Sequence, residues 1–202
     1  MPTPEKGEHW GILGGTFDPI HRGHLTLVRN IQLKKPLDGT LLIPAHKHPL
    51  KSEQAVASYD NRLAMLKLAV CELERVRIDE IEKELNLSGY TLDTVRAIKK
   101  RYPGVTFYFL VGADNITQMG SWHKPEEILD ELSIIAGTRP AFSPEQASGP
   151  LAARIEYIET TPVDISSSRI RSLISEGAQR NELIRWLDPS VYDYIVTRGL
   201  YR

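Results

Sequence analysis

The sequence predicts an α/β fold, namely a doubly wound and mostly parallel sheet with helices on both faces. Three observations support this prediction. Short apolar runs alternate with helical patterns along the chain, and no internal repeat or long low-complexity segment interrupts them. The chain has 202 residues, of which 41% are hydrophobic, enough to bury one sizeable core. Since such alternation favours parallel βαβ units, we expect one Rossmann-like domain spanning residues 1–202.

Six short apolar segments are expected to form the strands of this sheet. Residues 105–111 are the strongest of them, because they are rich in β-branched and aromatic side chains. The first strand is expected to end at Gly14-Gly15 and the second at Pro44. The expected strands are Trp10–Leu13, Leu41–Ile43, Val76–Ile78, Val105–Val111, Ile134–Ala136 and Ile155–Ile158.

Helical patterns occupy the segments between and after these strands. The first helix is expected near His24, where Leu25, Val28 and Ile31 recur at helical spacing. Further helices are expected at about residues 61–73 and 91–101, after Ser168, and at about residues 190–197. Cys71 closes the apolar run that starts at Leu63, and we expect it in the core. Residues 139–149, rich in Pro, Ser and Gly, are expected to form a surface loop.

The composition limits the classes of function. The formal net charge is −1, which gives no basic field for nucleic acid or for an anionic membrane. Any phosphate site must therefore be local. A single cysteine excludes an intrachain disulfide, and the first ten residues lack the apolar region of a signal peptide. We expect a cytoplasmic protein, whose oligomeric state the sequence leaves open, a homo-oligomer included.

The segment from Gly14 to His24 follows a strand and opens a helix. In sheets of this kind ligands bind beyond the carboxyl ends of the strands. Gly14 and Gly15 would let a ligand approach the main-chain N–H groups, and the helix N-terminus favours phosphate. His21 and His24 are three residues apart, so both can face one side and donate to phosphate oxygens. The segment is neither a P-loop nor a dinucleotide fingerprint, because the required lysine and glycine spacing are absent.

Two other interpretations of this segment are open. A glycine pair can be a simple turn, and a single histidine is most often structural, but two histidines flanking a glycine at a strand-to-helix junction favour phosphate binding. A metal site with His46 and His48 as further ligands is the third interpretation. It lacks a cysteine ligand and a fixed ligand spacing, so no protein-bound metal is expected.

A second polar segment, Ile165 to Arg171, lies near the C-terminus. Its serines are suited to cap a helix, and Arg171 in the first turn can reach phosphate. Taken alone, the segment favours a plain helix cap followed by a solvated arginine.

Together, the two segments resemble the signatures of the HxGH nucleotidyltransferase superfamily. His21-Arg22-Gly23-His24 matches the tetrad, and Ile165–Arg171 resembles Ile-Ser-Ser-Thr-x-Ile-Arg, with Ser168 in place of threonine. The resemblance implies that both histidines hold the ATP phosphates and stabilise the transition state. It implies an ATP site made of Gly14, Gly15, Thr16, Phe17, His21, His24, Asp114, Arg139, Ile165, Ser166, Ser168 and Arg171.

Within this superfamily, nearly the whole chain resembles bacterial nicotinate mononucleotide adenylyltransferase. Residues 43–51 resemble its basic Pro-x-x-x-Pro-Pro-His-Lys loop, with departures at His48 and Leu50. The resemblance implies that Asp114 meets a ribose, that main-chain N–H groups near Tyr90-Thr91 take the nicotinate carboxylate, and that Trp122 stacks on the pyridine ring. Residues 138–140 and 199–202 also match. The implied acceptor site is Gly15, Thr16, Lys51, Tyr90, Thr91 and Trp122, and the implied catalytic residues are His21, His24, Lys51 and Arg171.

The resemblance implies that AMP passes directly from ATP to nicotinate mononucleotide. Mg²⁺ would arrive with ATP, with phosphate and water as its main ligands. Two alternatives remain. The acceptor could be phosphopantetheine, although that family is typically shorter and this chain has extra segments around Tyr90-Thr91 and Trp122. The chain could also be a non-catalytic nucleotide-binding protein on the same fold. Taken alone, Trp122 is more often a core aromatic, and Asp114 could be only a helix N-cap.

Overall fold

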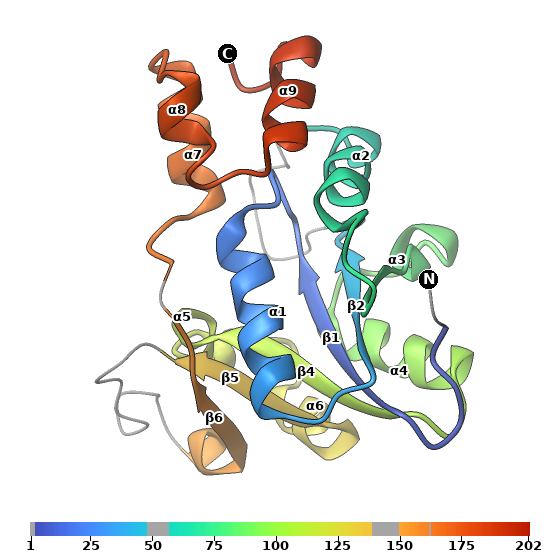
Figure 1. Ribbon diagram of the computed structural model, residues 1–202. Helices are drawn as coiled ribbons and strands as arrows, with labels where there is room; N and C mark the ends of the chain where they lie inside the picture. Colours follow the sequence, from blue (N-terminus) through green and yellow to red (C-terminus); the bar gives the residue numbers. More distant parts are fainter. Residues whose placement is uncertain (1–2, 48–56, 139–149, 162) are drawn as a thin grey trace.

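The computed structural model describes residues 3–47, 57–138, 150–161 and 163–202. Its centre is a six-stranded sheet in the order β3-β2-β1-β4-β5-β6, in which every pair of neighbouring strands is parallel (Figure 1). All six predicted strands are confirmed, and so is the doubly wound fold. The strands are β1 (His9–Gly15), β2 (Gly39–Pro44), β3 (Val76–Ile78), β4 (Thr106–Gly112), β5 (Ser133–Thr138) and β6 (Ile155–Glu159).

The chain winds outward from β1 in one direction and from β4 in the other. The edge of the sheet at the carboxyl ends of these two strands is therefore the topological switch point, where sheets of this type bind ligands. The prediction that β1 ends at the glycine pair is confirmed, since Gly14 and Gly15 are its last residues and pair with β2, opposite Ile43 and Pro44. The turn comes after them, at Phe17, whose φ is 51°.

Helices cover both faces of the sheet (Figure 1). All five predicted helices are confirmed, within a few residues at their ends. One face carries α1 (Arg22–Lys34), α2 (Tyr59–Val70), α7 (Ser167–Ser175) and α9 (Pro189–Arg198), and the other carries α3 (Ile81–Glu84), α4 (Thr91–Arg101) and α6 (Pro125–Glu131). Short helices that were not predicted are α3, α5 (Ala113–Ile116), α6, α8 (Arg180–Leu183) and the 3₁₀ turns η1 (Met119–Ser121) and η3 (Pro150–Arg154).

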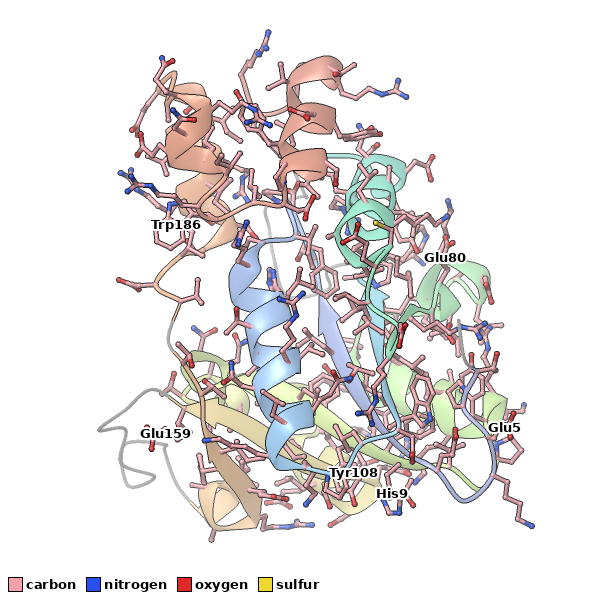
Figure 2. All side chains as sticks on the ribbon, in the orientation of Figure 1. Glu5, His9, Glu80, Tyr108, Glu159 and Trp186 are labelled. Atoms are coloured by element: carbon pink, nitrogen blue, oxygen red, sulfur yellow. The ribbon has the colours of Figure 1, made fainter. Side chains whose placement is uncertain are left out.

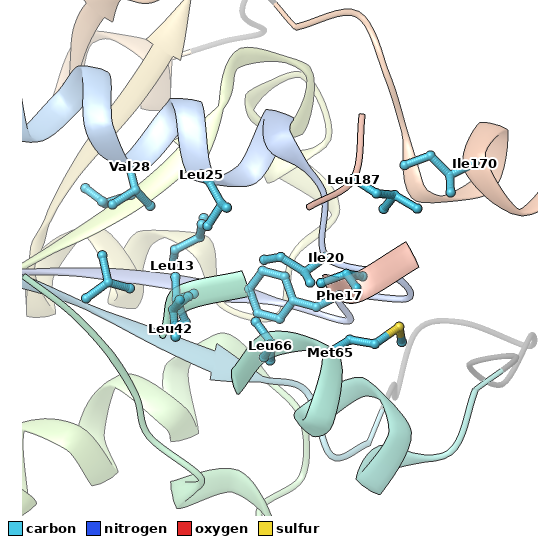
Figure 3. Close-up of a cluster of buried hydrophobic side chains, with 14 of the residues drawn as sticks. Leu13, Phe17, Ile20, Leu25, Val28, Leu42, Met65, Leu66, Ile170 and Leu187 are labelled. Carbon is cyan, nitrogen blue, oxygen red and sulfur yellow. The ribbon is translucent and has the colours of Figure 1, made fainter. Parts of the chain in front are cut away.

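The core forms two layers because side chains alternate along buried strands. Trp10 and Ile12 of β1 belong to the layer under α3, α4 and α6, whereas Leu13 belongs to the layer under α1 and α2. Figure 3 shows that Phe17 and Ile20, which follow β1, lie in this second layer with side chains from α2 and the C-terminal region. The loop after β1 is therefore held by apolar burial.

The expectation that Cys71 lies in the core is wrong. Helix α2 ends at Val70, and its buried apolar side chains are Leu63, Met65, Leu66 and Val70. Cys71 follows as the C-cap residue and is exposed. Among the described residues, no helix is both long and apolar enough to cross a membrane.

The amino ends of the central strands lie far from the switch point. There the rings of His9 in β1 and Tyr108 in β4 stack with their centroids 6.0 Å apart, side by side in Figure 2. His9 Nδ1 and the Tyr108 hydroxyl are 3.2 Å apart.

Candidate active site

The predicted phosphate loop occupies the switch point. It leaves β1 at Gly15 and enters α1 at Arg22, so that His21 is the N-cap residue of α1. The helix thus begins earlier than the sequence indicates, and both histidines belong to its first turn. The main-chain oxygen of Gly15 accepts from Ala45 N–H at 2.9 Å, which ties this loop to the segment after β2.

His21 and His24 form a stacked pair, as their spacing predicted. Their ring centroids are 3.8 Å apart with an interplanar angle of 28°. His21 is 7% exposed. The main-chain N–H of His21 donates to His24 Nδ1 at 3.3 Å, so neutral His24 carries its proton on Nε2, where it can donate to a ligand. His21 Nδ1 is buried without a protein partner among the described residues.

Burial keeps both imidazoles uncharged at neutral pH. Desolvation lowers the pKa of His21 to about 4. Desolvation, followed by the charge of His21, lowers the pKa of His24 well below its usual value. Neutral rings can stack closely, whereas two imidazolium ions would repel. As neutral rings the histidines can donate hydrogen bonds to a ligand, and Arg171 is the positively charged side chain that contacts their loop.

The buried His21 should make the fold sensitive to acid. The unfolded chain binds a proton at the ordinary pKa of 6.5, whereas the folded chain holds the His21 pKa at about 4. The unfolded state thus binds more protons between these values, and stability falls as pH falls through them. We expect His21 alone to lower the free energy of unfolding by about 2 kcal/mol between pH 7 and pH 5. Urea unfolding of wild type and His21→Gln at both pH values measures this, and an identical pH dependence in the two proteins would contradict it.

Two glycines of this segment provide space rather than a turn. A Cβ at Gly23 would lie 2.9 Å from His21 Nδ1, and one at Gly15 would lie 3.1 Å from the Phe17 ring. Neither glycine has a positive φ. Gly23 therefore makes room for the ring of His21, which explains why a glycine separates the two histidines.

Helix α7 brings the second predicted segment onto the phosphate loop. Ser167 Oγ donates to the main-chain oxygen of Pro19 at 2.9 Å, and Arg171 Nη1 donates to that of Asp18 at 2.8 Å. Arg171 Nη2 lies 3.4 Å from Ser168 Oγ. Ser166 caps the helix, since its Oγ accepts from Arg169 N–H at 3.2 Å. Arg171 lies in the second turn, not the first, and is not a simply solvated side chain.

Ile165 also contacts this region. Its side chain is partly buried against the core layer under α1, and its Cγ2 would be 3.7 Å from a Cβ at Gly23. Segments more than 140 residues apart in sequence are thus neighbours in space.

The predicted acceptor residues lie at the start of α4 and after β4. Tyr90 is the N-cap residue of α4, and Thr91 is the first residue of that helix. The Tyr90 N–H donates to Ser88 Oγ at 3.0 Å, and Ser88 Oγ donates to Asp93 at 2.5 Å. One of the two main-chain donors predicted for an acceptor carboxylate, the Tyr90 N–H, thus already has a side-chain partner.

Aromatic rings surround this helix start. The Tyr90 ring stacks on that of His123, with centroids 4.3 Å apart. Trp122 is half-buried and meets the Phe109 ring edge-on at 6.1 Å. Trp122 thus packs against the core with one side and leaves the other exposed. A core role and a role in stacking on a ligand ring are therefore compatible.

Three predicted site residues are not fully placed. Lys51 and Arg139 lie outside the described residues, as does His48. Asp114 lies in α5, directly after β4, and its side chain is not described. The N-cap of α5 is Gly112, so the alternative interpretation of Asp114 as an N-cap is wrong.

The metal-site interpretation finds no support in the described part of the chain. No group of three or more His, Cys, Asp or Glu side chains that could hold an ion occurs there. The His46 ring instead meets the Tyr59 ring edge-on, with centroids 5.6 Å apart.

Two buried charged residues, Asp18 in the loop and Arg62 behind it, were not predicted from the sequence as part of the site. Asp18 is 3% exposed and Arg62 is 3% exposed. Arg62 lies on α2 at helical spacing from Leu66 and Val70, which are core residues. The sequence signal for a buried Arg62 is that a charged residue stands among the apolar residues on one side of this helix.

Comparison with known proteins agrees with this geometry. The cytidylyltransferase-like family model matches residues 12–173. A probable nicotinate-nucleotide adenylyltransferase of Streptococcus pyogenes is 35% identical over 192 residues, covering 95% of this chain and 88% of the relative. One from Oceanobacillus iheyensis is 34% identical over 192 residues and covers 95% of each chain.

Solved structures share the fold. Plasmodium falciparum nicotinic acid mononucleotide adenylyltransferase complexed with NaAD has a TM-score of 0.76 at 20% identity, covering 96% of this chain and 97% of that one. A putative nicotinate-nucleotide adenylyltransferase from Vibrio parahaemolyticus has a TM-score of 0.70 at 21% identity, covering 96% of each chain. With its two polar segments joined at the switch point and relatives of this identity and coverage, the chain belongs to the cytidylyltransferase-like family, among the nicotinate-nucleotide adenylyltransferases.

Proposed function

We propose that the protein transfers the AMP group of ATP to nicotinate mononucleotide, producing nicotinate adenine dinucleotide and pyrophosphate. The observation that carries this proposal is the contact of α7 with the loop after β1. It brings Arg171 to the segment that bears the stacked pair His21 and His24. The two neutral histidines, Arg171 and the N-terminus of α1 thus meet on one loop, and groups of this kind are suited to bind and stabilise phosphate.

The reaction is a direct displacement. A phosphate oxygen of the acceptor attacks the α-phosphorus of ATP, the bond to the bridging oxygen breaks, and pyrophosphate leaves with its electron pair. No nucleophilic side chain is needed, so the protein contributes position and charge stabilisation. His24 donates from Nε2 to phosphate, His21 lies beside it, and Arg171 with Lys51 provides positive charge.

Residues Gly14 to Phe17 contribute main-chain groups to the ATP phosphates, and Thr16 lies between the two substrates. Ser166, Ser168 and Ile165 hold the start of α7 beside ATP. Asp114 and Arg139 complete the ATP site. Mg²⁺ bound to ATP supplies charge neutralisation on the leaving pyrophosphate.

The start of α4 would recognise the acceptor. Helix α4 has 11 residues, and its N-terminal N–H groups at Tyr90 and Thr91 favour an anion. The carboxylate of nicotinate can accept from such donors, and the exposed side of Trp122 can stack on the pyridine ring. Asp93 and Ser88 occupy the same helix start, so an incoming carboxylate must displace the Ser88 hydroxyl from the Tyr90 N–H.

The enzyme is expected to prefer nicotinate mononucleotide over its amide counterpart. The amide would direct its NH₂ group at a main-chain donor and leave buried groups unpaired, which costs about 1 to 3 kcal/mol, or roughly one to two powers of ten in kcat/KM. A pyrophosphate-release assay with ATP and Mg²⁺ measures kcat/KM for both acceptors. Trp122→Ala is the control, because loss of stacking should weaken both acceptors with little change in their ratio.

The same assay tests the proposed function itself. Phosphopantetheine belongs in the acceptor panel, and release with it alone would identify a different adenylyltransferase. Nucleotide binding without pyrophosphate release from any acceptor would identify a non-catalytic binder. Equal kcat/KM for the acid and the amide would show that the α4 start does not select the acceptor.

A further inference from the structure

The loop after β1 rests on a buried polar network that none of the predicted site residues explains. Its members are Asp18 on the loop, Arg62 on α2 and Tyr201 at the end of the chain, and we call them the Asp18 network. Asp18 and Arg62 are each 3% exposed and Tyr201 is 8% exposed. Buried charges are costly unless they are hydrogen-bonded, so a network of this kind needs a physical reason.

Arg62 joins three separate segments through their main-chain oxygens. It donates to Thr16 on the loop after β1 at 2.6 Å. It also donates to Ala45, after β2, at 2.9 Å, and to Ala57, before α2, at 3.3 Å. One planar guanidinium with five N–H donors can reach three carbonyl oxygens in different directions, whereas an ammonium group cannot reproduce this geometry.

Asp18 makes the second set of contacts. Its Oδ1 accepts from the Tyr201 hydroxyl at 2.6 Å and from Ala57 N–H at 3.2 Å. Ala57 therefore contacts the network on both sides, with its N–H bonded to Asp18 and its carbonyl to Arg62. Burial, followed by the hydrogen bond to Asp18, raises the pKa of Tyr201, so the phenol keeps its proton and remains the donor.

The network lies directly behind the residues that would bind phosphate. Thr16 and Asp18 flank Phe17 in the loop, and the main-chain oxygen of Asp18 also accepts from Arg171. The guanidinium of Arg62 adds a fixed positive charge behind the main chain of the loop. A displaced loop would move His21 and the contact with Arg171 together, and small displacements of catalytic groups reduce rates strongly.

We propose that Tyr201 and Arg62 are positioning residues, which hold the loop after β1 through Asp18 and Thr16 in the geometry that ATP binding and transfer require. This inference rests on the proposed function, because its main measurement is turnover. The residues do not touch the substrates, and they act through the loop.

Two tyrosine variants provide a matched test. Tyr201→Phe removes one hydroxyl, which bonds to Asp18. Tyr194→Phe removes one hydroxyl of the same C-terminal region, which bonds to Asn61 of α2 at 2.9 Å but not to the loop. Tyr201→Phe is expected to lower kcat/KM for ATP by about tenfold, the effect of losing a hydrogen bond to a charged group. Tyr194→Phe is expected to stay within about twofold of wild type, since it loses only a bond between neutral groups.

Thermal midpoints of both variants and activities at several temperatures below them separate positioning from stability. A positioning loss persists at low temperature, whereas a loss through partial unfolding disappears. Equal activity loss in the two variants, or none in Tyr201→Phe, overturns the role of Tyr201. An inactive wild type contradicts the proposed function instead.

Arg62→Lys tests the second residue. It keeps the positive charge but cannot bond to all three carbonyl oxygens, so we expect a fall in kcat/KM at least as large as that of Tyr201→Phe. Arg75→Lys is the control, because Arg75 also donates to main-chain oxygens, those of Leu37 and Asp38, away from the site. Unchanged ATP kinetics in Arg62→Lys overturns the role of Arg62, and if this variant does not fold, the tyrosine pair decides.

Discussion

His24→Ala is expected to lower turnover by about 10² to 10³ while the fold stays intact, the usual effect of removing one preorganised transition-state donor. The reason is geometric. His24 accepts from His21 N–H at Nδ1, which leaves its Nε2 proton for the ligand. His24 is in the first turn of α1, where alanine is a good helix residue, so little stability should be lost. Circular dichroism and pyrophosphate release, measured on the same sample, give the result.

Two further variants locate the effect within the ring. His24→Asn can still accept from His21 N–H but lacks an atom at the position of Nε2, so it should be as inactive as His24→Ala. His9→Ala removes a histidine of the same strand-helix unit at the far end of β1, next to Tyr108, and should keep full activity. Wild-type turnover in folded His24→Asn would show that Nε2 does not act on the phosphates.

Most of the fold was predictable because its determinants are local. Buried parallel strands need continuous apolar runs, as in β2, β4 and β5, while the edge strands β3 and β6 show shorter apolar patterns with charged residues between. Long helices such as α4 show periodicity over several turns. Helices as short as α3, α5 and α8 were missed since four residues carry no helical period. The end of β1 at its glycine pair was predictable, but the space that Gly15 leaves beside the Phe17 ring was not, because it depends on packing.

The site was predictable to the extent that its groups follow strands or begin helices. Parallel strands place their carboxyl ends at one edge, so the loop bearing His21 could be assigned to the site from sequence. The contact between α7 and this loop was implied only by the resemblance. The protonation states and the Asp18 network could not be inferred, because burial and hydrogen bonding join distant residues such as Asp18 and Tyr201.

Arg171→Ala is expected to lower kcat/KM for ATP by about one to two powers of ten, since a hydrogen bond to a charged group is worth roughly 1.5 to 3 kcal/mol. Arg171 bonds to the main-chain oxygen of Asp18, and we propose that it also contacts the ATP phosphates. Arg169→Ala is the matched control on α7. The Arg169 side chain is exposed, and its ion pair with Glu176, at 3.7 Å, is a surface pair that contributes little to stability.

Binding of ATP and AMP to Arg171→Ala separates the two roles. If Arg171 acts only by holding the loop, both nucleotides should lose the same factor in affinity. If it also contacts the β- or γ-phosphate, ATP should lose more, because AMP lacks these groups and their charge. We expect the larger loss for ATP, measured as dissociation constants by calorimetry. Unchanged ATP affinity and turnover would leave α7 as a helix whose serines cap it and whose arginine only packs against the loop.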